Sequence, residues 1–358
     1  MTSVSRNLDA DFEAKWQAFH QAAAVGGVRL PPAAAAEAEI RRVLGFSEFV
    51  SRHAVQNPDW VATLFQSDAL NIPRDRQAYQ RRWDAVFDGT FEAVFAQLPK
   101  VLRRFRREEM LRIAWRDLSG RAPLEEILSE LSDLADVCID NTLHLLHDDL
   151  CRHYGRPTAP DGRPLQMVVV GMGKLGAREL NFSSDVDLIL AFAQGGHTTG
   201  TEDQAAISND DFFTRLARRL IQTLSQVLPE GFVFRVDTGL RPFGESGPLV
   251  MSFNALENYY QSQGREWERY AWIKARIVAG DRADGEALLA LLQPFVYRRY
   301  LDFGVFDSLR EMKNKIALEV RRKGMARDIK LGAGGIREIE FFGQFFQLIR
   351  GGVVPALQ

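Results

Sequence analysis

The stretch MVVVGMGKLGARELNFSSDVDLILAF, residues 167–192, places a glycine-bearing turn between two apolar runs, and the second run begins with Asp185 and Asp187. Side chains two residues apart on a strand point to the same face, so the two carboxylates are expected to lie side by side. Close carboxylates repel each other unless one takes up a proton or a hard cation such as Mg²⁺ binds between them. Mg²⁺ often keeps substrate phosphates as further ligands. The pattern therefore predicts a site for a metal ion and a phosphate.

The turn Gly171-Met-Gly-Lys-Leu-Gly176 also fits parts of two other phosphate-binding motifs, but its surroundings fit neither. A dinucleotide-binding unit needs a long crossover helix before its second strand, and only about residues 175–180 are available for a helix here. A Walker A loop needs Ser or Thr after its lysine, whereas Lys174 is followed by Leu175. The remaining interpretation is a strand, a phosphate-holding turn, a short helix and a strand that carries Asp-x-Asp.

This order of elements resembles the nucleotidyltransferase superfamily to which DNA polymerase beta belongs. The resemblance implies an α+β fold, in which a small mixed β-sheet with helices is embedded between mainly helical regions. It also implies a third carboxylate on a later strand. The alternating apolar run 232–237 ends in an acid, so Asp237 joins Asp185 and Asp187 as the candidate catalytic and metal-binding set.

Four longer blocks give a closer resemblance. They are GMGKLGARELNFSSDVDL, RVDTGLRPFGESGPLV, YYQSQGREWERYAWIKARIVAGD and LGAGGIREIEFFGQFFQLIRGG, which lie in this order within residues 171–352. Together they resemble the glutamine synthetase adenylyltransferase family (glutamate-ammonia-ligase adenylyltransferase), whose members carry two related nucleotidyltransferase halves. The sequences of residues 181–184 and 335–341 are similar to those of the N-terminal half, which is the adenylyl-removing half in this family.

The resemblance implies an enzyme that removes AMP from an adenylylated tyrosine of glutamine synthetase by phosphorolysis, with Mg²⁺ as cofactor and ADP as product. Glutamine synthetase, ATP or ADP, phosphate and the PII signal protein are the implied partners. Two alternatives stay open, namely ATP-dependent adenylylation of glutamine synthetase and a nucleotide-sensing module without turnover. The sequence departs from the family pattern at Gly239, where an arginine is expected within Asp-x-Arg-Leu-Arg-Pro.

Six residues are candidates for nucleotide or phosphate binding. A turn lysine such as Lys174 is often only a solvated charge. For Arg241, the alternative to phosphate binding is a salt bridge to Glu245 or to the aspartates. A guanidinium can nevertheless pair with two phosphate oxygens at once. We place Lys274 and Arg276 on a helix among aromatic residues, where a charged outer face over a buried aromatic stripe is the plain explanation. The resemblance adds support for a role of both residues in the site. Of the two acids at positions 338 and 340, which face different ways on a helix, one is expected to reach the site. The six candidates are Gly173, Lys174, Ser184, Arg241, Lys274 and Arg276.

Composition indicates an ordinary globular protein. The 358 residues are 46% hydrophobic and 26% charged, and the formal net charge of -2 gives no overall attraction to nucleic acid or membrane. The basic run 103–107 is followed at once by two glutamates, so we interpret it as a solvated helix face. Two cysteines, Cys138 and Cys151, and a polar N-terminal sequence favour a cytoplasmic protein.

Apolar residues at spacings of three and four predict helices from Leu8 to about Leu118 and again over residues 123–154. Glycine and polar residues over 194–203 indicate a surface loop. Further helices are expected over residues 210–228, 305–322 and 336–349. We expect three parts, an N-terminal helical region (1–118), a nucleotidyltransferase catalytic domain (119–284) and a C-terminal helical region (285–358) that looks truncated.

Overall fold

The computed structural model of the chain divides into two compact units. Unit 1 consists of Met1–Cys138, Arg178–Ser184 and Gln226–Val233, and unit 2 consists of Ile139–Ala177, Asp185–Ser225 and Phe234–Gln358. The structure describes residues 3–32, 34–297, 318, 322, 328–330, 332 and 334–357. The predicted helix over 305–322 lies outside the described residues, apart from positions 318 and 322. The predicted domain boundaries after residues 118 and 284 stay a prediction.

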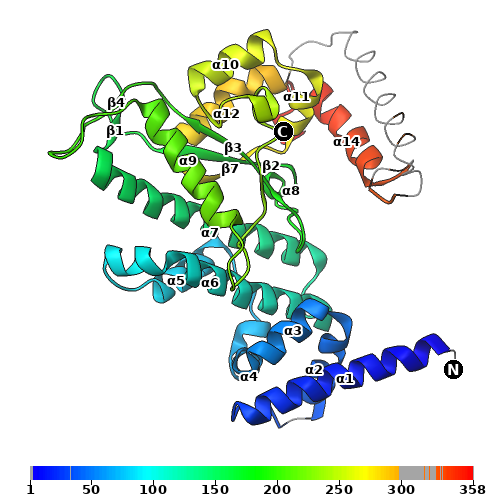
Figure 1. Cartoon of the computed structure of the whole chain (residues 1–358). Coiled ribbons are helices and arrows are strands. Elements are labelled where there is room, and N and C mark those ends of the chain that lie inside the picture. The colour runs from blue at the N-terminus through cyan, green and yellow to red at the C-terminus, as the bar shows by residue number, and fades with distance from the viewer. Residues whose placement is uncertain are drawn as a thin grey trace. The chain divides into compact units, whose positions relative to one another are not determined.

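Unit 1 is helical, as the spacing of apolar residues predicts (Figure 1). Polar side chains begin several of its helices by accepting a hydrogen bond from a free backbone N–H group: Ser47 from Val50 and Asp75 from Ala78. Gly120, in the left-handed region, ends the helix Phe91–Ser119. The elements are α1 (Ser3–Val25), α2 (Ala34–Phe46), α3 (Glu48–Gln56), α4 (Pro58–Gln66), η1 (Asp68–Leu70), α5 (Arg76–Val86), α6 (Phe91–Ser119) and the first part of α7 (Leu124–Tyr154).

The apolar faces of these helices meet in a core built around the buried rings of Phe19 and Trp115. The prediction of a solvated face for the basic run 103–107 is wrong for two of its arginines, since Arg103 is 0% exposed and Arg106 is 9% exposed. Arg103 is tolerated in the interior because backbone carbonyl groups accept its hydrogen bonds, including that of Pro99 at 2.7 Å.

Unit 2 is built on a five-stranded mixed sheet, which confirms the predicted fold class. The central strands β2 (Met167–Met172) and β3 (Val186–Phe192) are antiparallel, and β7 (Arg276–Gly280) pairs antiparallel with the other edge of β2. β5 (Val236–Asp237) and β6 (Val250–Ser252) both pair parallel with β3. β2 is buried along its whole length and β3 at all positions but one, which explains their nearly continuous apolar sequences.

Helices cover this sheet, with α9 (Asn209–Ser225) against β5 and β6 and α12 (Arg282–Val296) against β2 and β7 (Figure 1). The start of α9 is capped, because the Ser208 hydroxyl accepts a hydrogen bond from Asp211 N at 3.1 Å. The remaining elements of unit 2 are α7 from Ile139 onward, β1 (Pro157–Thr158), α8 (Gly173–Gly176), β4 (His197–Thr198), η2 (Gly244–Ser246), α10 (Phe253–Ser262), α11 (Glu266–Ile273), α14 (Ile336–Arg350) and η3 (Pro355–Leu357).

Three predicted elements differ in extent. The segment 194–203 is not all loop, because β4 pairs antiparallel with β1. The short helix predicted over 175–180 is α8, which begins at Gly173 and stops at Gly176. The run 232–237 yields only the two-residue strand β5, since Phe234 N bonds to the carbonyl of Leu224 in α9 instead of to a strand.

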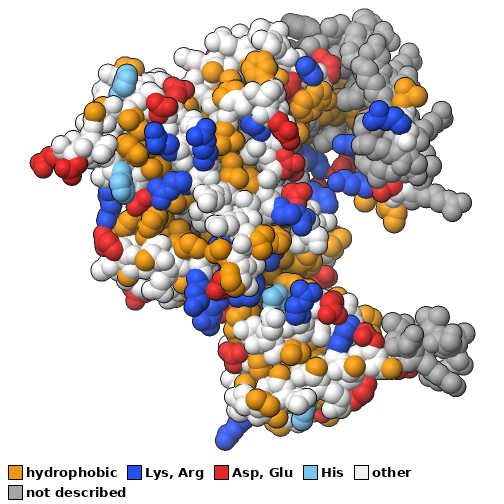
Figure 2. All heavy atoms as spheres, viewed as in Figure 1, with side chains coloured by type: hydrophobic (Ala, Val, Ile, Leu, Met, Phe, Trp, Pro, Cys, Tyr) orange, Lys and Arg blue, Asp and Glu red, His pale blue; other side chains and the backbone are white. Residues whose placement is uncertain are grey.

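Acidic and basic side chains are mixed on the face of the molecule shown in Figure 2, in keeping with the small net charge. Within the described part of the chain, no helix combines the length and the apolar character that crossing a bilayer requires.

A partly buried histidine in unit 2 gives the first testable prediction. Burial lowers the pKa of His147 to about 4; Arg156 and His144 act in the same direction and Asp148 opposes them. Its ring lies 5.4 Å from that of Phe212, and its Nδ1 has no hydrogen-bond partner among the described residues. Because the folded-state pKa is below the unfolded value of about 6.5, stability is fully present above pH 6.5 and is lost as the pH falls towards 4.

Between pH 7.5 and pH 5.0, we expect the His147→Gln variant to lose about 2 kcal/mol less of its free energy of unfolding than the parent loses. Urea unfolding at the two pH values measures this loss for the parent and for the variant. His197→Gln is the matched control, since His197 is exposed on β4. The same loss of stability in the parent and His147→Gln would contradict the assignment.

Candidate functional site

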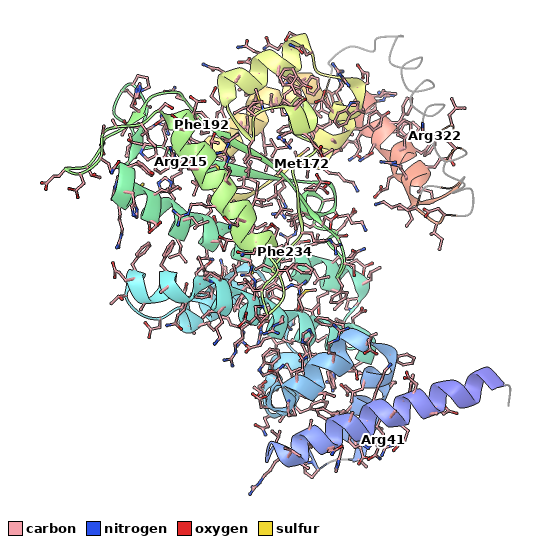
Figure 3. All side chains as sticks on the ribbon, in the orientation of Figure 1. Arg41, Met172, Phe192, Arg215, Phe234 and Arg322 are labelled. Atoms are coloured by element: carbon pink, nitrogen blue, oxygen red, sulfur yellow. The ribbon has the colours of Figure 1, made fainter. Side chains whose placement is uncertain are left out.

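The sheet of unit 2 brings two of the predicted carboxylates together. Asp187 is the second residue of β3 and Asp237 is the last residue of β5, and the two are direct partners in the parallel register. Asp185 lies immediately before β3, two residues from Asp187. Met172, labelled in Figure 3, is the partner of Asp187 on β2, so the glycine turn follows directly beside this carboxylate. The predicted Asp-x-Asp arrangement and the third acid thus meet at one end of the sheet.

The turn after β2 approaches Asp187 so closely that it requires glycine. Gly173 has a φ of 54°, a conformation that residues with a Cβ rarely adopt. A Cβ built on Gly173 would lie 2.7 Å from Asp187 Oδ2. Backbone and carboxylate are therefore in contact range, which is the approach that a phosphate-holding turn beside a metal ligand needs.

The charges at this edge perturb Asp187. Partial burial, followed by the nearby carboxylates of Asp237 and Asp185, raises the pKa of Asp187 to about 6, while the positive charge of Lys330 opposes this shift. Sequence reasoning missed Lys330, although it directly precedes the quoted block that starts at Leu331. The arrangement concentrates negative charge in a way that a bound cation would relieve.

The other two carboxylates have protein partners. Asp185 forms an ion pair with Nε of Arg235, and both side chains are about half exposed, at 48% and 56%. Asp237 accepts a hydrogen bond from Gly239 N at 2.6 Å. Gly239, the position that departs from the family pattern, thus contacts the site through its backbone, and a Cβ there would lie 3.0 Å from Asp237 Oδ1.

The carboxylates at this end of the sheet have the chemistry that a divalent cation needs, but only two of them are well placed to bind one. Across the described ranges, no group of three or more His, Cys, Asp and Glu side chains could hold a metal ion as it stands. Asp187 and Asp237, paired in register, supply the hard oxygen atoms that Mg²⁺ prefers. Asp185 would become a third ligand only after releasing Arg235. The three-carboxylate ligand set stays a prediction, with Asp187 and Asp237 as its best-placed pair.

Three further candidates lie close in sequence to these strands, one in the short helix α8 and two in loops. Lys174, in α8, makes no hydrogen bond or ion pair with the rest of the described chain, so its ammonium is available to a ligand. Arg241 donates from Nη1 to Thr238 O at 2.8 Å and from Nη2 to the carbonyl, not the carboxylate, of Glu245 at 3.0 Å. It therefore shapes its own loop. Ser184 donates to Asn181 Oδ1 at 2.5 Å and closes a tight turn just before Asp185.

The predicted helical placement of Lys274 and Arg276 is wrong. α11 ends at Ile273, and Arg276 is the first residue of β7, because its apolar, β-branched continuation pairs with β2. Arg276 donates to the carbonyls of Gly176 at 3.1 Å and Leu175 at 2.9 Å, which fixes the end of α8.

Lys274 Nζ lies 3.0 Å from Glu340 Oε1 of α14. Of the two acids on this helix, Glu340 is thus the one that contacts a candidate site residue. The other, Glu338, accepts a hydrogen bond from Gly334 N at 2.7 Å.

We expect Gly173→Ala to weaken Mn²⁺ binding about tenfold, a loss typical of disturbing a group that orients a metal ligand. The new methyl group would push Asp187 away and would also strain the backbone. Gly162→Ala separates the two effects, because Gly162 has a φ of 85° with no atom near its Cβ position. Titration with Mn²⁺ measures both variants. An equal loss in both would show that strain, not contact with Asp187, matters.

The sequence profile of glutamate-ammonia ligase adenylyltransferase matches residues 37–291, and that of GlnD PII-uridylyltransferase matches residues 310–357. Among curated proteins, the bifunctional glutamine synthetase adenylyltransferase/adenylyl-removing enzymes of Thioalkalivibrio sulfidiphilus and Nitrosococcus oceani are 52% and 53% identical over 317 residues. Each match covers 88% of this chain and 32% of the relative. The enzyme of the same name from Pseudomonas aeruginosa is 51% identical over 325 residues, or 89% of this chain and 32% of the relative. The chain thus spans about a third of the length of these relatives.

Proposed function

Because the chain belongs to the glutamate-ammonia ligase adenylyltransferase family, we propose that it removes AMP from an adenylylated tyrosine of glutamine synthetase by phosphorolysis. The relatives named above carry both adenylyltransferase and adenylyl-removing activities in chains about three times as long. The choice of removal rests on the similarity of residues 181–184 and 335–341 to the N-terminal half of the family.

The observation that carries the proposal is the pairing of Asp187 with Asp237 beside the backbone of Gly173. In the reaction, an oxygen of inorganic phosphate attacks the adenylyl phosphorus and the bond from phosphorus to the tyrosine oxygen breaks. The tyrosine oxygen takes up a proton, and the adenylyl group leaves as ADP. Such transfer needs positioning and charge stabilisation rather than covalent chemistry by the protein.

We assign Asp187 and Asp237, with Asp185, to holding Mg²⁺. When bound, Mg²⁺ would neutralise charge on the phosphates and align the attacking and leaving oxygens. The Gly173 turn would bring backbone close to a phosphate, and Lys174 would contribute a positive charge there. Arg241 and Arg276 would act mainly by shaping the loop after β5 and the end of α8, to which their hydrogen bonds go. Lys330 supplies a further positive charge near Asp187.

The remaining partners belong to the proposal as well. Glutamine synthetase is the protein substrate, and regulation by the PII signal protein is carried over from the family resemblance. We place the reaction in the cytoplasm, with which two free cysteines, one of them buried, are compatible.

Product analysis tests the direction of transfer. The chain is incubated with adenylylated glutamine synthetase, Mg²⁺ and ³²P-labelled phosphate, and nucleotides are separated. Phosphorolysis places the label in the β-phosphate of ADP, because the attacking phosphate becomes that group. Pyrophosphate formed from ATP and unmodified glutamine synthetase would instead identify adenylyl addition. Nucleotide binding without either product would indicate a sensing module.

A further inference from the structure

Two short segments that pack within unit 1 lead directly into predicted metal ligands. Arg178–Ser184 is followed by Asp185, and Gln226–Val233 precedes the strand that carries Asp237. The second segment is held by buried Arg103, which donates to the carbonyls of Gln226 at 2.5 Å and Gly231 at 2.7 Å. Unit 1 therefore anchors both stretches of chain from which the carboxylates follow.

The first segment is anchored to one face of α7. Arg178 Nη2 donates to Asp133 Oδ2 at 2.9 Å and to Ser129 Oγ at 2.8 Å. The side chain of Asp133 is only 5% exposed. Leu180 N donates to Ser132 Oγ at 3.3 Å, and Leu180 itself is buried. Positions 129, 132 and 133 share a helix face, so these contacts form one continuous attachment.

The backbone of Arg178 is unusual. Its φ of 59° lies in the left-handed region, which residues other than glycine, asparagine and aspartate rarely occupy. Such conformations persist only where the surroundings determine them, and they gather at functional sites. Here the ion pair of Arg178 with Asp133 and the hydrogen bond from Leu180 N to Ser132 Oγ hold the backbone in this conformation.

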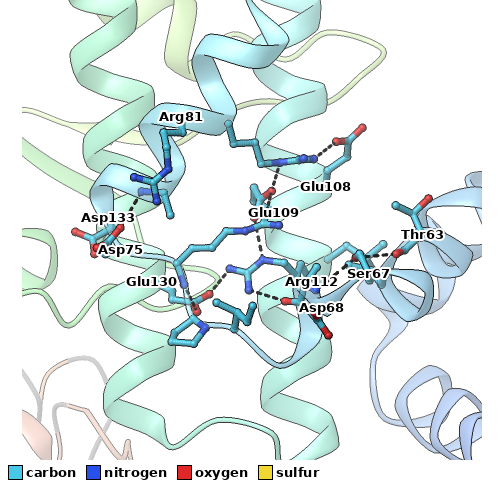
Figure 4. A pocket seen from close by; sticks show the side chains of 18 of the residues that line it. Thr63, Ser67, Asp68, Asp75, Arg81, Glu108, Glu109, Arg112, Glu130 and Asp133 are labelled. Carbon is cyan, nitrogen blue, oxygen red and sulfur yellow. Dashed lines mark hydrogen bonds and ion pairs between the residues drawn. The ribbon is translucent and has the colours of Figure 1, made fainter.

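The helix that carries Asp133 is itself held firmly. Asp133 and Glu130 of α7 line a cavity of about 950 Å³ together with other unit 1 residues; Figure 4 shows their side chains among those that line it. Glu130, one turn before Asp133, forms buried ion pairs with Arg112 and Arg116 of α6. Because α6 and α7 are joined by these charges, Asp133 offers Arg178 a fixed partner.

We propose that Arg178 and Asp133 are positioning residues for the carboxylate site. Their ion pair fixes Arg178–Ser184 on α7 and so sets where Asp185 lies, immediately before β3, and how it meets a cation. The inference rests on the proposed function, because it assigns these residues a part in the same metal site. Neither residue touches the reacting groups; both act through the segment between them and Asp185.

Mn²⁺ binding and hydrogen exchange of the intact chain test the proposal. We expect Arg178→Gln to weaken Mn²⁺ binding about tenfold, the size of effect seen when a residue that supports a metal ligand is lost. The amides of residues 180–187 should exchange about tenfold faster. Asp133→Asn should weaken Mn²⁺ binding and speed exchange to the same extent, without leaving the buried carboxylate unpaired. The double variant should bind Mn²⁺ no more weakly, and exchange no faster, than either single variant. Arg121→Gln is the control, since Arg121 forms a comparable ion pair with Glu39 away from this segment.

The outcomes are distinct. Weaker Mn²⁺ binding with faster exchange in residues 180–187, but not in Arg121→Gln, would support positioning. Unchanged exchange in this segment, or faster exchange with Mn²⁺ binding equal to that of the parent, would overturn it. If Asp187→Asn bound Mn²⁺ as tightly as the parent does, this result would overturn the metal site of the proposed function, and the positioning role with it.

Discussion

Asp187→Asn is expected to lower the rate of ADP formation by about 10²–10³-fold, the loss typical of removing one preorganised electrostatic group from an active site. Asparagine keeps the shape of the side chain but removes the charge that would hold a cation between β3 and β5. Among the predicted ligands, Asp187 has the largest expected effect, because it is the one that contacts both the register partner Asp237 and the turn at Gly173.

The same variant should be at least as heat-stable as the parent. Asp187 is partly buried beside two like charges, so its neutral form costs less to fold when no cation is bound. Asp203→Asn, in an exposed loop, is the matched control and should leave both rate and stability unchanged. Thermal unfolding and labelled ADP formation are measured together. An active Asp187→Asn would remove Asp187 from the mechanism, whereas an inactive but unfolded one would point to a structural role.

The sequence predicted that the carboxylates meet, because the relevant contacts are local or set by the strand period. Two acids two residues apart on one strand must share a face, and an acid at the end of a later strand meets them if that strand is a neighbour. β5 is such a neighbour of β3, and its register places Asp237 opposite Asp187. Gly173 was predicted as part of a phosphate-holding turn, whereas its close approach to Asp187 is seen only in the structure.

The partners of these residues depend on chain segments far away in sequence, which no local pattern reveals. Arg276 was placed on a helix because aromatic residues precede it, yet pairing with β2 makes it part of a strand. Arg235 lies 50 residues from Asp185, and nothing in either motif indicates their ion pair. A run of arginines looks solvated until backbone carbonyls from a distant loop, such as that of Gly231, accept the hydrogen bonds of Arg103.

The second large expected effect is a loss of stability on changing Glu130, which belongs to a network of buried charges in unit 1. Glu130 is 2% exposed and pairs with Arg112 and Arg116, each 1% exposed. It also accepts hydrogen bonds from Arg74 N at 2.9 Å and from Tyr79 OH at 3.4 Å. Removing Glu130 leaves Arg112 with Glu109 and Arg116 with Glu126 as acidic partners, so two buried guanidinium groups lose part of their charge compensation, which costs far more than the net contribution of the pair.

Glu130→Gln is therefore expected to lower the free energy of unfolding by about 3–5 kcal/mol, because two buried guanidinium groups lose their shared carboxylate. Glu126→Gln is the matched control on the same helix. Glu126 also pairs with Arg116, but it is 30% exposed, so water can replace it and we expect a loss of at most about 1 kcal/mol. Urea unfolding followed by tryptophan fluorescence measures both, since Trp83 and Trp115 lie in the core of unit 1. Equal small losses would mean that water reaches Glu130 and that the network does not hold α6 to α7.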